Sequence, residues 1–118
     1  ASSGAVWGAF TNCGQVCSSV ERVYVARSIY QTFVDMVEAK TNKLRIGSGL
    51  DFGVDMGPMI SLDQLGIVEN QVLDAIERGA RIVTGGKRPE HLNGYFHAPT
   101  VLTEVNHSMK AMSDETFG

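Results

Sequence analysis

The chain has 118 residues, of which 43% are hydrophobic and 19% charged, and its formal net charge is −3. These values predict one globular domain near the small end of the usual size range, and they exclude a disordered chain. Charges of both signs are spread without a basic cluster, so we expect no nucleic-acid surface. No apolar run is as long as a membrane span, and no signal peptide is recognisable. Two cysteines are too few for a secreted disulfide scaffold, which favours a cytoplasmic protein.

The first half of the chain predicts a helix, a strand, a second helix and a loop, in that order. Apolar and small residues over 1–10 are typical of the end of an apolar helix, and the β-rich run 20–25 predicts a short strand. Ser28 is expected to cap a helix over residues 29–45, because apolar side chains recur there at helical spacing. The glycine-rich stretch 47–58 predicts a loop.

The next helix has clearer signals at both ends. Residues 61–64 form a capping box, in which the Ser61 hydroxyl and the Gln64 amide reciprocally satisfy free backbone N–H groups. An apolar stripe follows at helical spacing, formed by Leu65, Val68, Val72 and Ile76. Gly79 then stands where a left-handed residue commonly ends a helix. The sequence therefore predicts a helix between Ser61 and Gly79.

The last part of the chain reads as extended segments and an irregular tail. Residues 80–84 predict a short strand, and residues 95–105 predict an extended segment in which Pro99 limits pairing. The tail from Asn106 is expected to be irregular. Strands alternating with helices indicate an α/β fold, with layered helices and a largely parallel sheet. Such a sheet needs cover on both faces, so we expect the chain to be part of a larger domain.

The two cysteines, Cys13 and Cys17, allow several interpretations from the residues alone. A lone cysteine is most often buried as a small hydrophobe. A zinc site needs about four ligands, and the three histidines are too scattered to complete one, so we predict no metal. A disulfide between residues four apart on a helix would be strained. A redox pair more usually has the spacing Cys-x-x-Cys. A redox switch and a non-catalytic module with a buried cysteine remain as alternatives.

The residues around Cys17 favour a nucleophile. Gly14 permits a sharp turn just before it. Ser18 and Ser19 are small enough to leave the thiol accessible, and their backbone N–H groups can face a developing negative charge. On local composition this stays one hypothesis among several.

A family resemblance extends this hypothesis to the whole chain. The segment Phe10-x-Asn12-x-Gly14-Gln15-x-Cys17-Ser18-Ser19 resembles the active-site cysteine segment of the NAD(P)-dependent aldehyde dehydrogenase superfamily. Further motifs of that family recur in the same order: Arg22-Val-Tyr-Val25, Gly57-Pro58-Met-Ile-Ser61, Gly79-Ala80-Arg81, Gly85-Gly86, Gly94-Tyr95-Phe96-x-x-Pro99-Thr100 and Asp114-Glu115-Thr116-Phe117-Gly118.

The resemblance implies a catalytic role for Cys17. Its thiolate would attack an aldehyde carbonyl to give a thiohemiacetal oxyanion. Loss of hydride to the nicotinamide would leave a thioester, which water, or coenzyme A in the acylating branch, resolves. The oxyanion would be held by the backbone N–H of Cys17 and by an asparagine outside this chain.

The resemblance also implies roles for residues near both ends of the chain. Glu115 matches the glutamate that binds the nicotinamide ribose of NAD or NADP, and Phe117 matches an aromatic residue that packs near the nicotinamide. Val16 and Ser18 would help to shape the aldehyde pocket, whereas Cys13 would be a bystander. Structural roles are expected for three further residues: Asn12, Gln15 and Arg22.

Other parts of the family pattern are not found here. The nucleotide-binding domain, the general-base glutamate and the oxyanion asparagine are absent from the sequence. We therefore expect residues 1–118 to be a partial catalytic domain, running from the nucleophile segment to the Glu-x-Phe-Gly motif, and to be inactive alone. The parent enzyme is expected to be a homo-oligomer that oxidises aldehydes to carboxylic acids, with hydrolysis favoured over acylation of coenzyme A. Succinate semialdehyde is one plausible substrate.

Overall fold

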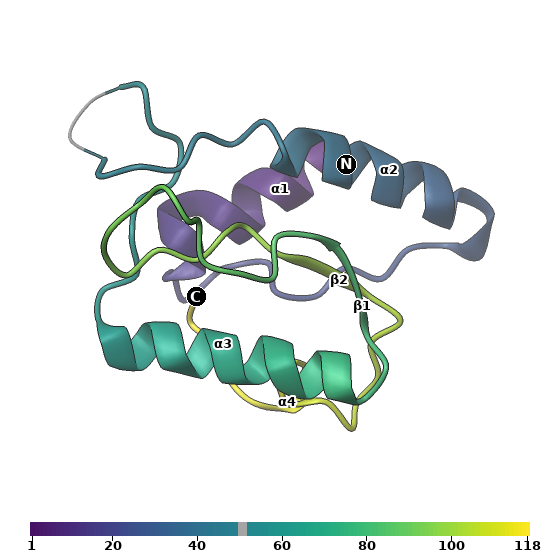
Figure 1. Ribbon diagram of the computed structural model, residues 1–118. Coiled ribbons are helices and arrows are strands. Elements are labelled where there is room, and N and C mark those ends of the chain that lie inside the picture. Colours follow the sequence, from purple (N-terminus) through teal and green to yellow (C-terminus); the bar gives the residue numbers. More distant parts are fainter. Residues whose placement is uncertain (50–51) are drawn as a thin grey trace.

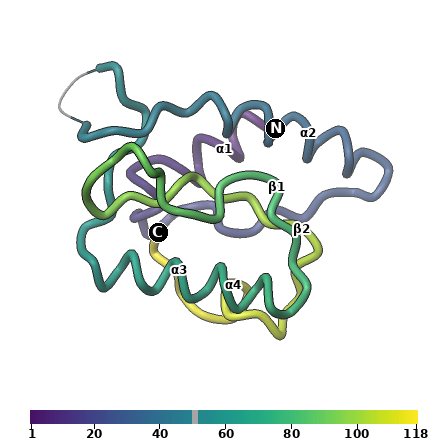
Figure 2. Tube along the Cα trace, viewed as in Figure 1, coloured from purple at the N-terminus to yellow at the C-terminus, as the bar shows by residue number. Residues whose placement is uncertain are grey.

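Two pairs of helices enclose the strands of the protein (Figure 1). The computed structural model describes residues 1–49 and 52–118. On one side lie α1 (Ser2–Phe10) and α2 (Tyr30–Thr41), and on the other lie α3 (Leu62–Glu77) and the short α4 (Lys110–Ser113). The C-terminus lies between the end of α1 and the start of α3 (Figures 1 and 2). The C-terminal residue thus lies against the turn that follows α1, where Gly118 approaches Gly14.

The helix predicted after Ser28 starts later and ends earlier than expected. Ser28 lies inside the turn η2 (Arg27–Ile29), and Ile29 takes the N-cap position of α2 without a side-chain cap. The expectation of a Ser28 cap is therefore wrong, because a tight turn already engages the backbone here, with Ile29 N donating to Ala26 O at 3.1 Å. The helix stops at Thr41 rather than near residue 45.

The predicted signals at the two ends of α3 are largely confirmed. The backbone N–H of Gln64 donates to the Ser61 hydroxyl at 3.1 Å. Gly79 has a φ of +98°, and its N–H donates to Ile76 O at 3.0 Å, so a left-handed residue closes the helix as expected. The other half of the capping box is wrong, since the Gln64 amide does not return to Ser61. It donates instead to carbonyls of the C-terminal segment, which runs beside the first turn of α3.

The strands of this chain pair antiparallel. β1 (Arg81–Thr84) runs against β2 (Val101–Thr103), with Arg81 opposite Thr103. The connection between them, residues 85–100, contains no helix, so it returns the chain as a hairpin-like excursion and not as a parallel crossover. A largely parallel sheet is therefore not formed by the strands of the described residues, although the mixture of helices and strands fits the α/β class.

Two expectations about irregular segments also changed. Residues 20–25 have no regular secondary structure, and no strand among the described residues pairs with them, so the strand prediction is wrong for this chain. The loop predicted over 47–58 is confirmed on both sides of residues 50–51, which lie outside the described residues. Arg45 and Asp55 join its two ends with an ion pair of 2.8 Å, and the Arg45 side chain holds the pKa of the Asp55 carboxyl well below its usual range.

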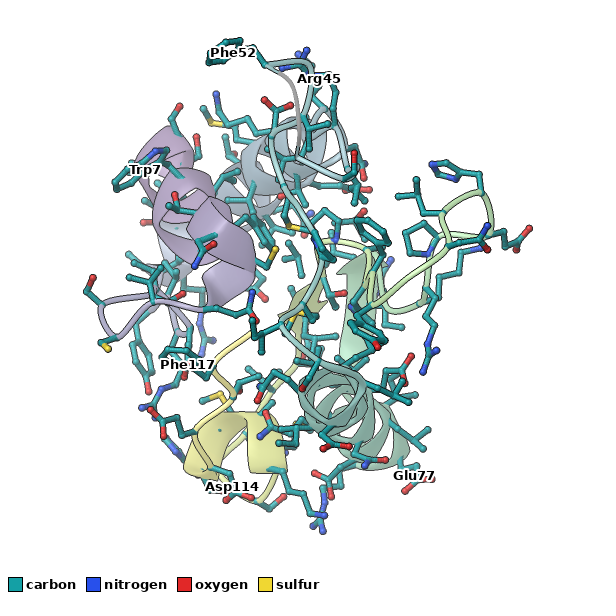
Figure 3. The ribbon with its side chains drawn as sticks, turned by 90° about the vertical axis from the view of Figure 1, so that its left-hand side faces the viewer. Trp7, Arg45, Phe52, Glu77, Asp114 and Phe117 are labelled. Atoms are coloured by element: carbon teal, nitrogen blue, oxygen red, sulfur yellow. The ribbon has the colours of Figure 1, made fainter. Side chains whose placement is uncertain are left out.

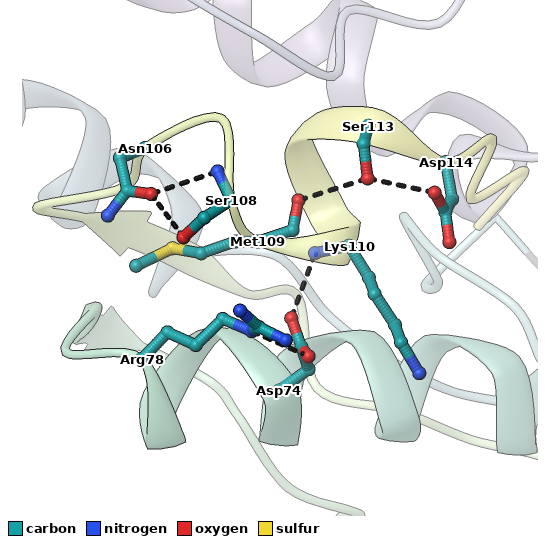
Figure 4. Close-up of polar contacts among 8 residues, drawn as sticks. All are labelled: Asp74, Arg78, Asn106, Ser108, Met109, Lys110, Ser113 and Asp114. Carbon is teal, nitrogen blue, oxygen red and sulfur yellow. Dashed lines mark hydrogen bonds and ion pairs between the residues drawn. The ribbon is translucent and has the colours of Figure 1, made fainter.

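The C-terminal tail is less irregular than predicted, because α3 organises it (Figure 4). Asp74 of α3 accepts the backbone N–H of Lys110 at 2.8 Å and the Nε–H of Arg78 at 2.9 Å. These bonds lower the pKa of the Asp74 carboxyl, with the Lys110 backbone contact as the main cause. Met109, just before α4, is fully buried against α3 and β2. The first turn of α4 is thus capped by a neighbouring helix.

The main core joins the N-terminal turn to α3. Its buried members are Cys13, Met56, Met59, Leu65, Val68 and Val72, with Phe10 and Ile46 packed against them. Several large apolar side chains are exposed to solvent. They include Trp7 (74% exposed) and Phe52 (105% exposed), which both project from the surface in Figure 3. Such side chains are available for contact with more protein. Among the residues described, no helix is long and apolar enough to cross a membrane.

Candidate active site

The segment that leads to Cys17 has an unusual backbone. Asn12, Cys13 and Gly14 take consecutive φ angles of +52°, +62° and +75° in the turn η1 (Thr11–Gly14). For residues other than glycine, this left-handed conformation costs about 1–2 kcal/mol each. Contacts from the surrounding structure must therefore hold the turn.

Reciprocal side-chain bonds close this turn. Asn12 Nδ2 donates to Gln15 O at 3.1 Å, and Gln15 Nε2 donates to Asn12 O at 3.2 Å. Gln15 Oε1 also accepts the N–H of Ile60 at 2.9 Å, which ties the turn to the segment before α3. Farther along, Arg22 Nη1 donates to Met112 O at 3.2 Å. The structural roles expected for Asn12, Gln15 and Arg22 are confirmed by these bonds.

Cys13 is buried and serves as another anchor of the turn. Its thiol lies 3.0 Å from Gly57 O and 3.4 Å from Pro58 O, so it donates into the Gly-Pro segment. Burial raises the pKa of the Cys13 thiol. A protonated, hydrogen-bonded thiol is a poor nucleophile. This geometry supports the bystander role for Cys13.

Cys17 has a different environment. It is exposed and occupies the first of two central positions in a β-turn closed by Ser19 N donating to Val16 O at 2.9 Å. The alternative in which Cys17 is merely buried is therefore wrong. In the described part of the chain, the backbone N–H groups of Cys17 and Ser18 have no hydrogen-bond partner. They are free to face a negative charge. Val16 is half-buried and Ser18 is exposed.

The segment that carries Glu115 and Phe117 is held through its backbone. Gln64 Nε2 donates to the carbonyls of Thr116 and Phe117 at 2.6 and 3.1 Å. Phe117 has a φ of +54° and is 37% exposed, and it lies between α1 and α4 in Figure 3. Within the part of the chain that the structure describes, the Glu115 carboxylate makes no hydrogen bond or ion pair. Both of its oxygens are thus available to a ligand.

The two candidate segments touch through their glycines. A methyl group on Gly14 would lie 2.9 Å from the carbonyl carbon of Gly118 and 3.1 Å from its oxygen. Gly14 is three residues before Cys17, and Gly118 directly follows Phe117. Only a glycine permits this approach, so the fold brings the cysteine turn and the Glu-x-Phe segment together from opposite ends of the chain.

A cavity of about 180 Å³ lies beside this contact. Its polar lining includes Cys13, Gln71, His97 and Thr116. Burial lowers the pKa of His97, whose Nδ1 lies 3.0 Å from Ala98 O. None of the five candidate site residues lines the cavity; these are Val16, Cys17, Ser18, Glu115 and Phe117. The described residues contain no group of three potential metal ligands.

Two residues that organise the site were not predicted from the sequence. Gln64 was assigned to its own helix cap, and Gln71 was not singled out. Both lie on α3 and both bond the Glu115–Phe117 segment. One signal was present in the sequence: two amides seven residues apart share one side of a helix, next to the apolar stripe.

The chain thus combines an α/β fold with an exposed cysteine turn that packs against a Glu-x-Phe-Gly segment. The model of the aldehyde dehydrogenase family matches residues 1–118, and the chain belongs to this family.

Relatives and solved structures agree with this membership. The chain is 48% identical over 109 residues to a 3-sulfolactaldehyde dehydrogenase of Priestia aryabhattai, which covers 92% of this chain and 22% of that protein. It is 42% identical over 115 residues to a succinate-semialdehyde dehydrogenase [NADP(+)] of Escherichia coli K12, covering 98% of this chain and 24% of that protein. A betaine aldehyde dehydrogenase of Staphylococcus aureus, solved with NAD+, superposes with a TM-score of 0.94 at 35% identity, over 99% of this chain and 24% of the other.

These comparisons confirm the recognised family and the α/β class. The chain spans about a quarter of the length of the relatives it matches.

Proposed function

We propose that this chain is the nucleophile-bearing part of an NAD(P)-dependent aldehyde dehydrogenase, with residues 1–118 forming part of its catalytic domain. The observation that carries the proposal is the contact of Gly14 with Gly118, because it places the Cys17 turn beside the segment of Glu115 and Phe117. The reaction requires a nucleophile close to the bound cofactor. Adjoining segments of this chain thus supply the proposed nucleophile and the proposed cofactor contact.

Cys17 is the proposed catalytic residue. Its sulfur adds to the aldehyde carbon, and the electron pair of the carbonyl bond moves onto the oxygen. The unpartnered N–H of Cys17 is suited to stabilise this oxyanion. The oxidised nicotinamide, when bound, supplies the acceptor for the hydride that this carbon loses, and a thioester with Cys17 remains. Hydrolysis of the thioester requires a general base from outside these residues. Val16 and Ser18 flank the sulfur and form part of the proposed aldehyde pocket.

The residues present fit an NAD or NADP contact. Glu115 offers a carboxylate without a partner among the described residues, which can accept hydrogen bonds from the two hydroxyl groups of a ribose. Phe117, two residues farther along the chain, offers a partly exposed ring. Relatives include one named for NADP+ and one solved with NAD+. A cytoplasmic homo-oligomer, without nucleic-acid or membrane partners, completes the proposal.

The relatives also suggest a class of substrate. Sulfolactaldehyde and succinate semialdehyde both carry an anionic group besides the aldehyde, and we propose the same for this enzyme. With the complete protein, kcat/KM for succinate semialdehyde is expected to exceed that for an uncharged aldehyde of equal length by about tenfold or more, the worth of one charge-assisted hydrogen bond. Formation of the reduced cofactor measures both rates. If the complete protein reduces no cofactor with any aldehyde, the proposed function is wrong.

Glu115→Gln is expected to weaken cofactor binding while sparing the fold. A hydrogen bond to a charged group contributes about 1.5–3 kcal/mol, so KM for the cofactor should rise by roughly 10- to 100-fold. Steady-state kinetics and a thermal melt measure the two effects. Glu77→Gln, at an exposed position near the end of α3, is the matched control. An unchanged kcat and an unchanged cofactor KM for Glu115→Gln would refute the assignment.

A further inference from the structure

Helix α3 holds the Glu115–Phe117 segment with two amide side chains. Gln64 and Gln71 are seven residues apart, two turns of helix, so they share one side of α3. Both side chains end on the backbone or hydroxyl groups of residues 115–117. The segment is therefore fixed to a regular helix at two points, and this leaves the Glu115 side chain free.

The contact of Gln71 is specific in its chemistry. Gln71 is only 6% exposed; its Nε2 donates to Glu115 O at 3.3 Å, and its Oε1 accepts the hydroxyl hydrogen of Thr116 at 2.6 Å. A carbonyl oxygen can only accept, so the amide nitrogen must face Glu115. The amide orientation then requires a donor on the other side, which the Thr116 hydroxyl supplies. One buried amide thus forms hydrogen bonds with two consecutive residues.

This contact restrains the backbone from which the Glu115 side chain projects. With the Glu115 carbonyl bonded to α3, the peptide plane after its Cα cannot rotate freely. Gln64 restrains the next two carbonyls, on both sides of the left-handed Phe117. A left-handed phenylalanine costs about 1–2 kcal/mol, so these bonds hold a conformation that the free chain would leave.

We propose that Gln71 is a positioning residue for the cofactor, which acts with Thr116 to lock the backbone that presents Glu115. This inference rests on the proposed function, since the ribose contact of Glu115 is itself part of that proposal. Gln71 does not touch the cofactor. It fixes the backbone position of Glu115, and this position determines how well the Glu115 carboxylate can hydrogen-bond the ribose.

The test uses three variants of the complete protein. Gln71→Met keeps the length of the side chain and removes both bonds, Thr116→Val keeps the shape and removes the hydroxyl, and the third variant combines them. Gln31→Met is the control, because Gln31 is an exposed glutamine of α2 whose side chain donates to Asp35 Oδ1 at 2.7 Å, far from the Glu115–Phe117 segment in sequence. Cofactor KM, kcat at saturating cofactor, aldehyde KM and the melting temperature are measured for each.

The expected result is a split between the kinetic constants. Each single variant raises the cofactor KM by about 3- to 10-fold, the loss expected for a buried hydrogen bond, while aldehyde KM stays as in the wild type. The double variant is no worse than Gln71→Met, because both changes remove the same bond. If Gln71→Met lowers only the melting temperature and its cofactor KM equals that of Gln31→Met, Gln71 merely packs and the inference is wrong.

If Gln71→Met does not fold, Thr116→Val alone tests the inference, and an unchanged cofactor KM in that variant overturns it. Two further outcomes, both obtained with Glu115→Gln, separate this inference from the proposed function. If Glu115→Gln also leaves cofactor KM unchanged in an active enzyme, the role of Glu115 fails. An effect of Glu115→Gln without any effect at Gln71 and Thr116 contradicts the inference only.

Discussion

Cys17→Ser in the complete protein is expected to lower kcat for aldehyde oxidation by at least about 10³-fold, as removal of a covalent nucleophile commonly does. A serine hydroxyl is a far weaker nucleophile than a cysteine thiol at neutral pH. The turn itself should form as before, because its closing bond joins the backbones of Val16 and Ser19. Cofactor affinity is therefore expected to stay within about twofold of the wild type.

Cys13→Ser is the matched control for this loss. A serine hydroxyl can still donate to Gly57 O, so activity should stay within a few-fold of the wild type. Steady-state kinetics measures kcat for both variants, and titration with the cofactor measures its affinity. Substantial activity in Cys17→Ser, or a loss of equal size in Cys13→Ser, contradicts the assignment of the nucleophile.

Gly14→Ala is expected to push the Cys17 turn and the Glu115–Gly118 segment apart. The added methyl group would meet Gly118 at 2.9 Å and Ala9 O at 3.2 Å, and Gly14 also has a φ of +75°. All three obstacles are backbone features, which cannot rotate away as a side chain can. The turn or the Gly118 segment must shift, and a displacement of about 1 Å at an active site can cost on the order of 10²-fold in rate.

Gly79→Ala provides the comparison for the backbone strain alone. Gly79 is also left-handed, with a φ of +98°, but a methyl group there meets nothing within 4 Å. We expect Gly79→Ala to lose about 1–2 kcal/mol of stability and to keep its kcat. Gly14→Ala should lose more stability and most of its activity. Thermal melts measure stability and steady-state kinetics measures kcat. Equal losses of stability and of kcat in the two variants would mean that the contact with Gly118 is not needed for activity.

Local sequence signals predicted the parts of the fold that depend on neighbouring residues. The Ser61 cap and the Gly79 end of α3 involve bonds within a few positions, and both are confirmed. The strand prediction for 20–25 failed because an extended segment becomes a strand only through a partner, which local pattern does not reveal. Ser28 failed because a competing tight turn engaged the backbone before the helix began.

The candidate site shows the same division. The family motifs indicated Cys17, Glu115 and Phe117, and these remain proposals that the contacts support. The role of Gln64 was misassigned because its local partner, Ser61, competed with carbonyls that come from the far end of the chain. The spacing of Gln71 from Gln64 did not reveal its partners, which lie 44 and 45 positions away. Distant pairing of this kind follows from the fold and not from spacing.

The central claim, that Cys17 is the nucleophile, is tested most directly by following alkylation and activity together. The complete protein is treated with iodoacetamide at neutral pH, and samples are assayed for aldehyde oxidation while tandem mass spectrometry distinguishes the two cysteines. Because Cys17 is exposed and Cys13 is buried, we predict that activity falls with the same rate constant as Cys17 is modified, while Cys13 stays free. Full activity in protein whose Cys17 is completely alkylated would contradict the account.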